Sequence, residues 1–136
     1  MLKEEGDGSL KPYIILASVL LFDQFSKVIV RNTTAYSVNT GTVFGLLQGN
    51  NLLFIIITVA VIAALLYYYR KLKEKSILNQ SAIALITGGA LSNLIDRVVF
   101  GGVIDYIDLK FWPSFNIADA ALVAGMTIFF IGMKKK

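Results

Sequence analysis

Two aspartates near the end of the chain have a spacing that suits acid and base catalysis. Asp105 follows the Gly101-Gly102 turn after one apolar run, and Asp119 lies near the start of the last apolar run. If both runs cross a membrane, the two carboxyls reach the same boundary. Two carboxyls within hydrogen-bonding distance do not both ionise easily, so one keeps a proton while the other is charged. Such a pair can activate water and protonate a peptide carbonyl oxygen, as in aspartic proteases.

The composition narrows the chemistry further. The 136 residues include no Cys and no His, which excludes disulfides, thiol nucleophiles, Ser-His-Asp triads and most zinc sites. Ser26 and Lys27 are the nearest candidates for a Ser-Lys pair, but neighbours on a helix point about 100° apart. Any chemistry must then use carboxylates, hydroxyls, amides, Lys or Arg, and a pair of carboxylates requires no metal.

Each aspartate also has a structural interpretation. Asp119 suits the positive N-terminal end of a helix, with Asn116 or Ser114 as the cap. Asp105 suits a solvated turn, as Asp108 does. Spacing alone leaves both interpretations open beside a catalytic pair.

Other polar residues lie within the apolar runs, where ionisable groups are costly and therefore candidates for function. Asp23 and Lys27 are four residues apart and can form an ion pair on one helix face, which we interpret first as a structural anchor. Asn93 and Arg97 are also four apart and share a face, while Asp96 points elsewhere. Arg97 does not titrate usefully, so it suits holding a carboxylate or a peptide carbonyl.

Four apolar runs must position these residues. Hydrophobic residues make up 56% of the chain and charged residues 16%, below the roughly 25% of an ordinary soluble protein. A helix of about 18 residues can just cross the hydrocarbon core of a bilayer. The runs cover residues 13–30, 52–69, 77–100 and 116–133. We predict an all-α membrane protein with four transmembrane helices, a single domain over residues 1–136, and a flexible tail over residues 1–12.

The basic residues predict the orientation, since cytoplasmic segments near span ends retain positive charge. Nine lie on one side: Lys3, Lys11, Arg70, Lys71, Lys73, Lys75, Lys134, Lys135 and Lys136. At most four lie on the other: Lys27, Arg31, Arg97 and Lys110. We therefore expect both termini in the cytoplasm. The net charge of +4 forms no patch interleaved with aromatic residues, so we expect no nucleic acid partner.

The two outer connections are the longer ones, so the working surface is expected outside. Residues 31–51, between the first two helices, are rich in Thr, Val, Asn and Gly, which predicts a small extracytoplasmic segment with short β-strands. Residues 101–115 form the second outer connection.

Five segments, taken in order, resemble the motifs of the bacterial lipoprotein signal peptidases, or signal peptidase II. They are DQFSK at 23–27, NTGTVFG at 39–45, GGALSNLIDR at 88–97, VIDYI at 103–107 and FNIAD at 115–119. The resemblance runs from the first helix into the fourth. This chain departs from the family pattern at Val43, Ser92 and Tyr106, and its spacer between the two aspartates is short.

The resemblance implies an intramembrane aspartyl endopeptidase of the bacterial cytoplasmic membrane, with its site near the extracytoplasmic face. Its substrate would be a prolipoprotein, cut before a cysteine that carries diacylglycerol, within membrane lipid and without a cofactor. The resemblance also implies inhibition by globomycin, and we expect a monomer. It makes Asp105 and Asp119 the catalytic pair. The supporting residues are Asn39, Asn93, Arg97 and Asn116 around the pair and substrate, with Asp23 and Lys27 as structural support.

Two other functions remain as alternatives. A small four-helix proton-coupled transporter would place its key acid near the middle of the membrane and use short loops on both sides. A noncatalytic membrane scaffold would give Asp105, Asp119, Asn93 and Arg97 no reason to cluster. The location of the acids distinguishes these functions.

Overall fold

The computed structural model describes residues 7–42, 46–71 and 76–134. Four helices account for most of them: α1 Asp7–Thr33, α2 Asn51–Lys71, α3 Ile77–Phe100 and α4 Ile117–Lys134. Each is long and apolar enough to cross a membrane. The prediction of four helices with the length and composition to span a membrane is therefore confirmed.

The first helix begins earlier than predicted. Residues 7–12, which we expected in a tail, belong to α1, so that prediction is wrong for this part. Pro12 lies inside the helix, where it removes one backbone hydrogen bond without ending the helix. Residues 1–6 lie outside the described residues. The other three helices begin and end within two residues of the predicted spans.

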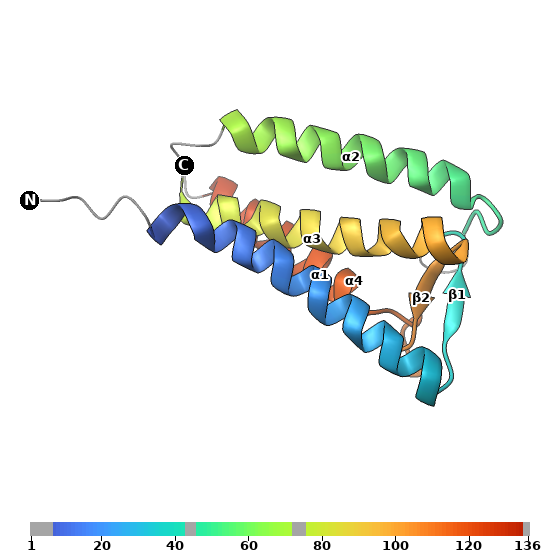
Figure 1. Ribbon diagram of the computed structural model, residues 1–136. Helices are drawn as coiled ribbons and strands as arrows, with labels where there is room; N and C mark the ends of the chain where they lie inside the picture. Colours follow the sequence, from blue (N-terminus) through green and yellow to red (C-terminus); the bar gives the residue numbers. More distant parts are fainter. Residues whose placement is uncertain (1–6, 43–45, 72–75, 135–136) are drawn as a thin grey trace, which may run out of the picture.

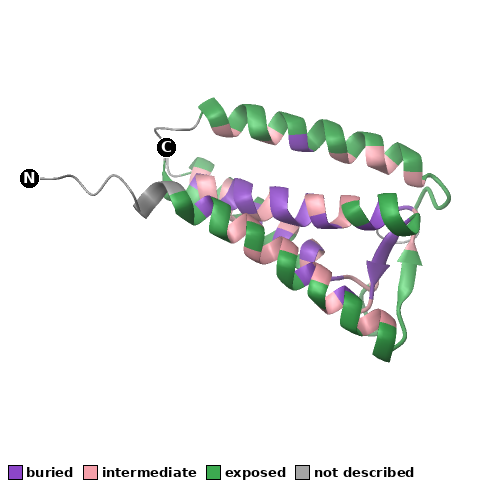
Figure 2. Ribbon diagram, viewed as in Figure 1, coloured by how far each residue is buried: buried purple, intermediate pink, exposed green. Residues whose placement is uncertain are grey.

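Helix α3 is the centre of the bundle. It packs against α1, α2 and α4, and it carries most of the buried helical residues, whereas α2 is largely exposed (Figure 2). Small residues make the close packing possible. A Cβ added to Gly88 would lie 3.0 Å from the carbonyl oxygen of Leu16 in α1, and one added to Gly89 would lie 2.5 Å from that of Ala118 in α4. The backbones of three helices thus meet at this point.

A two-stranded antiparallel sheet connects the loops at one end of the bundle (Figure 1). Strand β1, Ser37–Asn39, pairs with β2, Val103–Asp105, so that Ser37 lies opposite Asp105. The prediction of several strands within residues 31–51 is wrong in one respect. The described part of that segment holds a single strand, and its partner comes from the connection between α3 and α4. A strand needs a partner for its backbone groups, and the nearest one is supplied by the other connection.

We call the end of the bundle with the sheet the sheet end. The start of α1 and the end of α4 lie at the opposite end (Figure 1). Arg70 and Lys71 of α2 and Lys134 of α4 also lie at that opposite end, in the last turns of their helices. The assignment of this basic end to the cytoplasm stays a prediction.

Candidate active site

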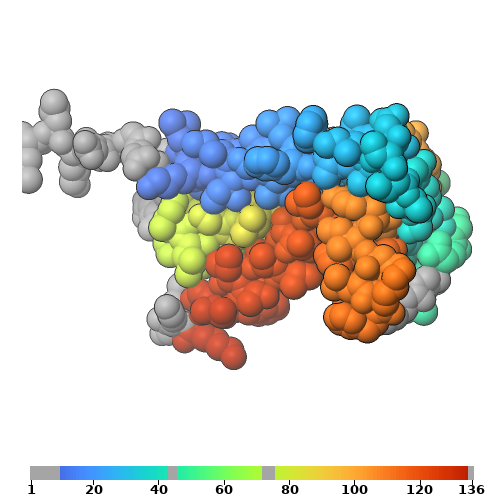
Figure 3. Space-filling model, turned by 90° about the horizontal axis from the view of Figure 1, so that it is seen from below, coloured from blue at the N-terminus to red at the C-terminus, as the bar shows by residue number. Residues whose placement is uncertain are grey.

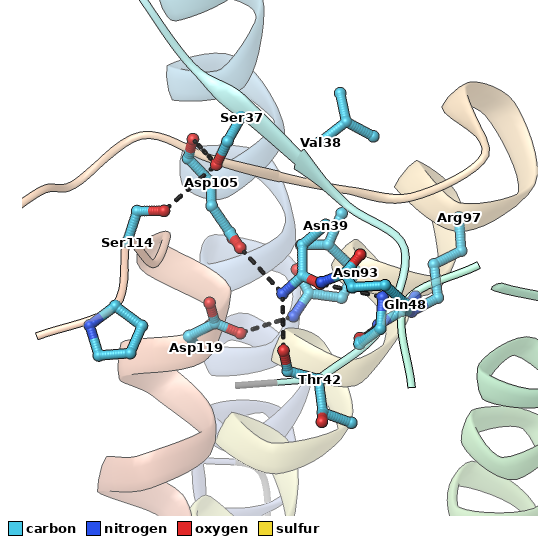
Figure 4. Close-up of a pocket in the computed structure, with 13 residues that line it drawn as sticks. Ser37, Val38, Asn39, Thr42, Gln48, Asn93, Arg97, Asp105, Ser114 and Asp119 are labelled. Carbon is cyan, nitrogen blue, oxygen red and sulfur yellow. Dashed lines mark hydrogen bonds between the residues drawn. The ribbon is translucent and has the colours of Figure 1, made fainter. Parts of the chain in front are cut away.

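A cavity of about 520 Å³ at the sheet end contains both predicted catalytic aspartates. Asp105 reaches it from the end of β2 and Asp119 from the first turn of α4 (Figure 4). The full lining is Ser37, Val38, Asn39, Gly41, Thr42, Gln48, Asn93, Arg97, Val103, Asp105, Pro113, Ser114 and Asp119. Three of the residues predicted to support the catalytic pair line the cavity beside both carboxyls: Asn39, Asn93 and Arg97. A fourth, Asn116, contacts Asp105.

Asp105 is buried, with only 3% of its surface exposed, so its interpretation as a solvated turn residue is wrong. Its Oδ1 accepts a hydrogen bond of 3.0 Å from Asn116 Nδ2, and its Oδ2 accepts a longer one of 3.4 Å from Asn39 Nδ2. Burial, followed by the charge of Asp119, raises the pKa of the Asp105 carboxyl to about 7. This carboxyl therefore holds a proton over much of the range below neutral pH.

Asp119 combines a capping position with a place in the cavity. Its backbone N–H donates to Asn116 Oδ1 at 2.8 Å, and its Oδ2 accepts from the Asn116 backbone N–H at 3.2 Å. This reciprocal pair resembles a capping box, so the predicted cap by Asn116 is present. Asp119 Oδ1 also accepts a 2.9 Å hydrogen bond from Asn93 Nδ2. The cap therefore orients the carboxylate toward the cavity, and the structural and chemical interpretations are compatible.

Two asparagines connect the carboxyls to each other. Asn116 Nδ2 lies 3.0 Å from Asn93 Oδ1, in addition to its contact with Asp105. Asn93 in turn donates to Asp119. Each carboxyl thus accepts a hydrogen bond from an asparagine, and the two asparagines are hydrogen-bonded to each other. A change at either asparagine should disturb both carboxyls.

A buried charged cluster lies behind the cavity. Lys27 Nζ lies 2.5 Å from Asp23 Oδ2 and 2.6 Å from Asp96 Oδ2, and all three side chains are almost fully buried. Lys27 Nζ also donates to Asn93 Oδ1 at 3.1 Å. Asp96 Oδ2 accepts from the backbone N–H of Ile104, the residue before Asp105. The cluster thus positions the Asn93 side chain, which orients Asp119, and strand β2, which carries Asp105.

Asp23 also reaches α4 directly. Its Oδ1 accepts the backbone N–H of Ala118 at 2.8 Å, and its Oδ2 accepts the Ser92 hydroxyl at 2.6 Å. The predicted ion pair of Asp23 and Lys27 is present. It belongs to a network that also includes Asp96, Ser92 and the start of α4, which the spacing of the pair does not indicate. The role of Asp96 in this network was missed, because a helical residue gives no signal of which partner it meets across a bundle.

Arg97 holds the first outer segment to the bundle. Its Nη2 donates to the Gly41 carbonyl at 2.8 Å, and its Nη1 donates to Asn51 Oδ1 at 3.1 Å. Asn51 Nδ2 returns a hydrogen bond to the Arg97 carbonyl at 2.9 Å. The guanidinium also stacks near the ring of Phe54, with 5.0 Å to the ring centroid. The expected role of Arg97 as a holder of peptide carbonyls matches this geometry, whereas Asn51 was not anticipated.

Asn39 is positioned by Gln48, which was also missed. Gln48 Nε2 donates to Asn39 Oδ1 at 3.1 Å, and its Oε1 accepts from the Thr40 hydroxyl at 2.6 Å. With its oxygen accepting from Gln48, the Asn39 side chain presents its amide nitrogen to both Asp105 Oδ2 at 3.4 Å and the Thr42 carbonyl at 3.3 Å. A single glutamine in a loop carries no pattern that would identify it in the sequence.

The Ser-Lys alternative is not supported by the geometry. The Ser26 hydroxyl donates to the Asp23 carbonyl at 2.7 Å and contacts the Tyr106 hydroxyl, while Lys27 is occupied by two carboxylates.

Two of the residues that depart from the family pattern make hydrogen bonds: Tyr106 with Ser26, and Ser92 with Asp23. The third, Val43, lies outside the described residues.

Comparisons with known proteins agree with the resemblance seen in the sequence. Residues 15–135 match the model of a family described as signal peptidase (SPase) II. A lipoprotein signal peptidase of Moorella thermoacetica is 40% identical over 133 residues, covering 86% of this chain and 89% of the relative. One from Syntrophomonas wolfei is 44% identical, covering 82% of this chain and 74% of the relative. A bacterial membrane enzyme solved at 2.3 Å resolution superposes with a TM-score of 0.83 at 32% identity, covering 99% of this chain and 93% of that structure.

Proposed function

This chain belongs to the signal peptidase II family, a family of aspartic peptidases, and from that premise we propose an intramembrane endopeptidase that uses Asp105 and Asp119. Family membership supports removal of signal peptides from prolipoproteins by a multi-pass membrane protein. The substrate in this proposal is a diacylglyceryl-modified prolipoprotein, cut immediately before the modified cysteine. No cofactor takes part.

The observation that carries the proposal is the arrangement of two carboxyls in one cavity. They come from different elements, β2 and α4, and the same two asparagines orient them. A noncatalytic scaffold would gain nothing from placing two acids, one buried and one half-buried, in the same cavity, because each loses solvation there. A proton-coupled transporter would place its acid near the middle of the membrane, whereas these acids lie at one end of the spans.

The proposed reaction needs one charged and one protonated carboxyl. Asp105 suits the protonated role because its pKa is raised to about 7 and one of its two hydrogen bonds is long, at 3.4 Å. Asp119 suits the charged role because it accepts closer hydrogen bonds at both oxygens, at 2.9 and 3.2 Å. Asp119 takes a proton from water as the water oxygen bonds to the scissile carbonyl carbon, and Asp105 donates its proton to the carbonyl oxygen. The carbon–nitrogen bond then breaks as Asp119 gives its proton to the leaving nitrogen. Asp105 recovers its proton from the tetrahedral hydroxyl.

The residues around the pair have distinct proposed roles. Asn93 and Asn116 orient the carboxyls, and Asn39 contacts Asp105 from the first outer segment. Arg97 holds the Gly41 carbonyl and so keeps that segment over the cavity. The substrate peptide would lie beneath this segment, with its acyl chains in the surrounding bilayer.

The proposal includes a location and an orientation. The sheet end faces the extracytoplasmic side, and the basic end, with Arg70, Lys71 and Lys134, faces the cytoplasm. The membrane is the bacterial cytoplasmic membrane. The two carboxyls and the side chains that orient them belong to one four-helix bundle, so the proposed site needs no residue from a second copy and the proposal is a monomer. Globomycin is the expected inhibitor.

The test is cleavage of a defined substrate by the purified chain in proteoliposomes. A prolipoprotein is supplied with and without diacylglycerol on its cysteine, and the products are identified by intact mass. The proposal predicts one cut before the modified cysteine, loss of that cut with globomycin, and little cleavage of the unmodified form. An intact lipidated substrate, or a cut at another bond, would contradict it, and proton flux in the same liposomes would then support the transporter.

A further inference from the structure

The connection between β2 and α4 carries an exposed apolar tip, which we define as Leu109, Phe111 and Trp112. Their exposed fractions are 47%, 84% and 53%. Side chains of this size and type are usually withdrawn from water unless they serve an interaction. The connection forms a lobe that projects beside α4, orange next to red in Figure 3. The tip therefore lies outside the four helices and needs its own explanation.

Local hydrogen bonds hold the tip in a closed loop. At its base, the Ile107 N–H donates to the Phe115 carbonyl at 2.9 Å, and the Phe115 N–H donates back to the Ile107 carbonyl at 3.1 Å. At its turn, Asp108 accepts from both the backbone N–H and the Nζ of Lys110, at 2.8 and 3.0 Å. The charged groups of the turn thus satisfy each other, while the apolar side chains of the tip remain exposed.

The position of the tip limits what it can touch. Helix α4 begins at Ile117, five residues after Trp112, and α4 is apolar enough to cross a membrane. A segment of that length spans at most about 18 Å even when fully extended. The tip therefore lies close to the boundary where α4 enters the bilayer.

We propose that the apolar tip inserts into the lipid interface at the sheet end, with Trp112 at the level of the headgroups. Tryptophan is enriched at this depth because its ring is apolar and its N–H is polar. Lys110, whose side chain is 87% exposed, has an aliphatic stem that can lie along the apolar layer while its ammonium group stays paired with Asp108 at the polar surface. This combination of aromatic, aliphatic and basic residues suits a bilayer interface better than a protein partner.

Contact between the tip and the lipid would also affect the position of the cavity. The base of the tip lies between Asp105 and Asp119 in the chain, and Pro113 and Ser114 line the cavity itself. Insertion of the tip would set the height of the cavity relative to the lipid headgroups. The membrane contact does not depend on the proposed peptidase activity, so the two can fail separately.

The test uses the fact that Trp112 is the only tryptophan of the chain. Its fluorescence is measured in proteoliposomes containing phospholipids brominated along the acyl chain, and in separate samples with acrylamide in the water. We expect strong quenching by bromine placed near the headgroup, weaker quenching by deep bromine, and little quenching by acrylamide. Strong acrylamide quenching with weak bromine quenching would overturn the proposal. Protection from both quenchers would also overturn it, because protein would then cover the tip.

A matched pair of variants tests whether the neighbouring side chains hold Trp112 in lipid. Phe111→Ser removes the most exposed apolar side chain of the tip, and it should reduce quenching by shallow bromine roughly twofold. Phe130→Ser removes an exposed phenylalanine of α4 and should leave Trp112 unchanged. Equal helical content by circular dichroism shows that both variants are folded. Unchanged quenching in Phe111→Ser would count against insertion.

Discussion

Asn116 Nδ2 lies 3.0 Å from Asp105 Oδ1, so the residue that caps α4 also holds the carboxyl at the end of β2. The fourth helix and the sheet are thereby joined at the reacting groups. An asparagine suits this position because its amide donates while its oxygen accepts, and neither group titrates. A carboxylate in its place would add a third acid to the cavity.

We predict that Asn116→Ala lowers both activity and stability. Loss of the cap should reduce the free energy of unfolding by about 1–2 kcal/mol. The turnover number should fall by more than the remaining folded fraction explains, because Asp105 loses the hydrogen bond from the Asn116 amide, and Asn93, which orients Asp119, loses the same partner. The measurement is cleavage per folded molecule. Asn32→Ala, whose side chain bonds to a carbonyl of its own helix, is the control and should retain activity.

Lys27→Met tests the buried charged cluster. The change leaves Asp23 and Asp96 buried without their cation, which should lower the free energy of unfolding by about 3–5 kcal/mol. Lys110→Met breaks an exposed ion pair and should change stability little. Denaturation of both variants in detergent is compared with the native chain. Equal stability of the two variants would show that the cluster is not needed for folding.

The pH dependence follows from the raised pKa of Asp105. The folded state keeps a proton on this carboxyl up to about pH 7, whereas the unfolded chain releases it near 3.8. Between these values the folded state binds more protons, so the contribution of Asp105 to stability falls as pH rises from about 4 to about 7. Activity should also fall as pH rises through about 7, because the proton donor is lost. Denaturation and kcat/KM are measured over this range.

Asp105→Asn separates the two effects of pH. This variant has no titrating group at the position, so its stability should vary less between pH 4 and pH 7 than that of the native chain. A native-like decline of stability in the variant would assign the pH dependence to another group.

Arg97→Lys should weaken the attachment of the first outer segment to the helix bundle. A lysine keeps the charge but has no planar fork to reach Gly41 and Asn51 together. We expect kcat/KM to fall about tenfold or more, from the loss of at least one charged hydrogen bond. Arg31→Lys, at a position near the ring of Phe100, should change kcat/KM little. Similar effects of both changes would argue against the anchoring role of Arg97.

Much of the fold follows from local patterns in the sequence. The four spans are marked by apolar runs, and the small residues Gly88 and Gly89 mark the place where helices meet. The start of α4 is marked by Asn116 and Asp119, three residues apart, whose types suit a helix N-terminus. The start of α1 was misplaced because the apolar run begins only after Pro12, whereas the helix continues through that proline.

Contacts across the bundle were harder to predict. The pairing of β1 with β2 joins residues 64 or more positions apart, and three-residue strands have too little pattern to show their partner. Asp96, Asn51 and Gln48 support the site through partners that sequence spacing does not indicate. The two aspartates were found because their motifs resemble those of a family, since spacing alone left turn and cap interpretations open.

The most direct test of the account compares Asp105→Asn and Asp119→Asn with the native chain at equal folded amounts. Both changes keep the size of the side chain and remove its ability to hold or release a proton. Asp108→Asn, at an exposed position in the same connection, is the matched control. Cleavage of the diacylglyceryl-modified prolipoprotein before its cysteine is measured for all four proteins. The account predicts that the native chain and Asp108→Asn cleave while the other two variants do not, and cleavage by either Asp105→Asn or Asp119→Asn at the native rate would contradict it.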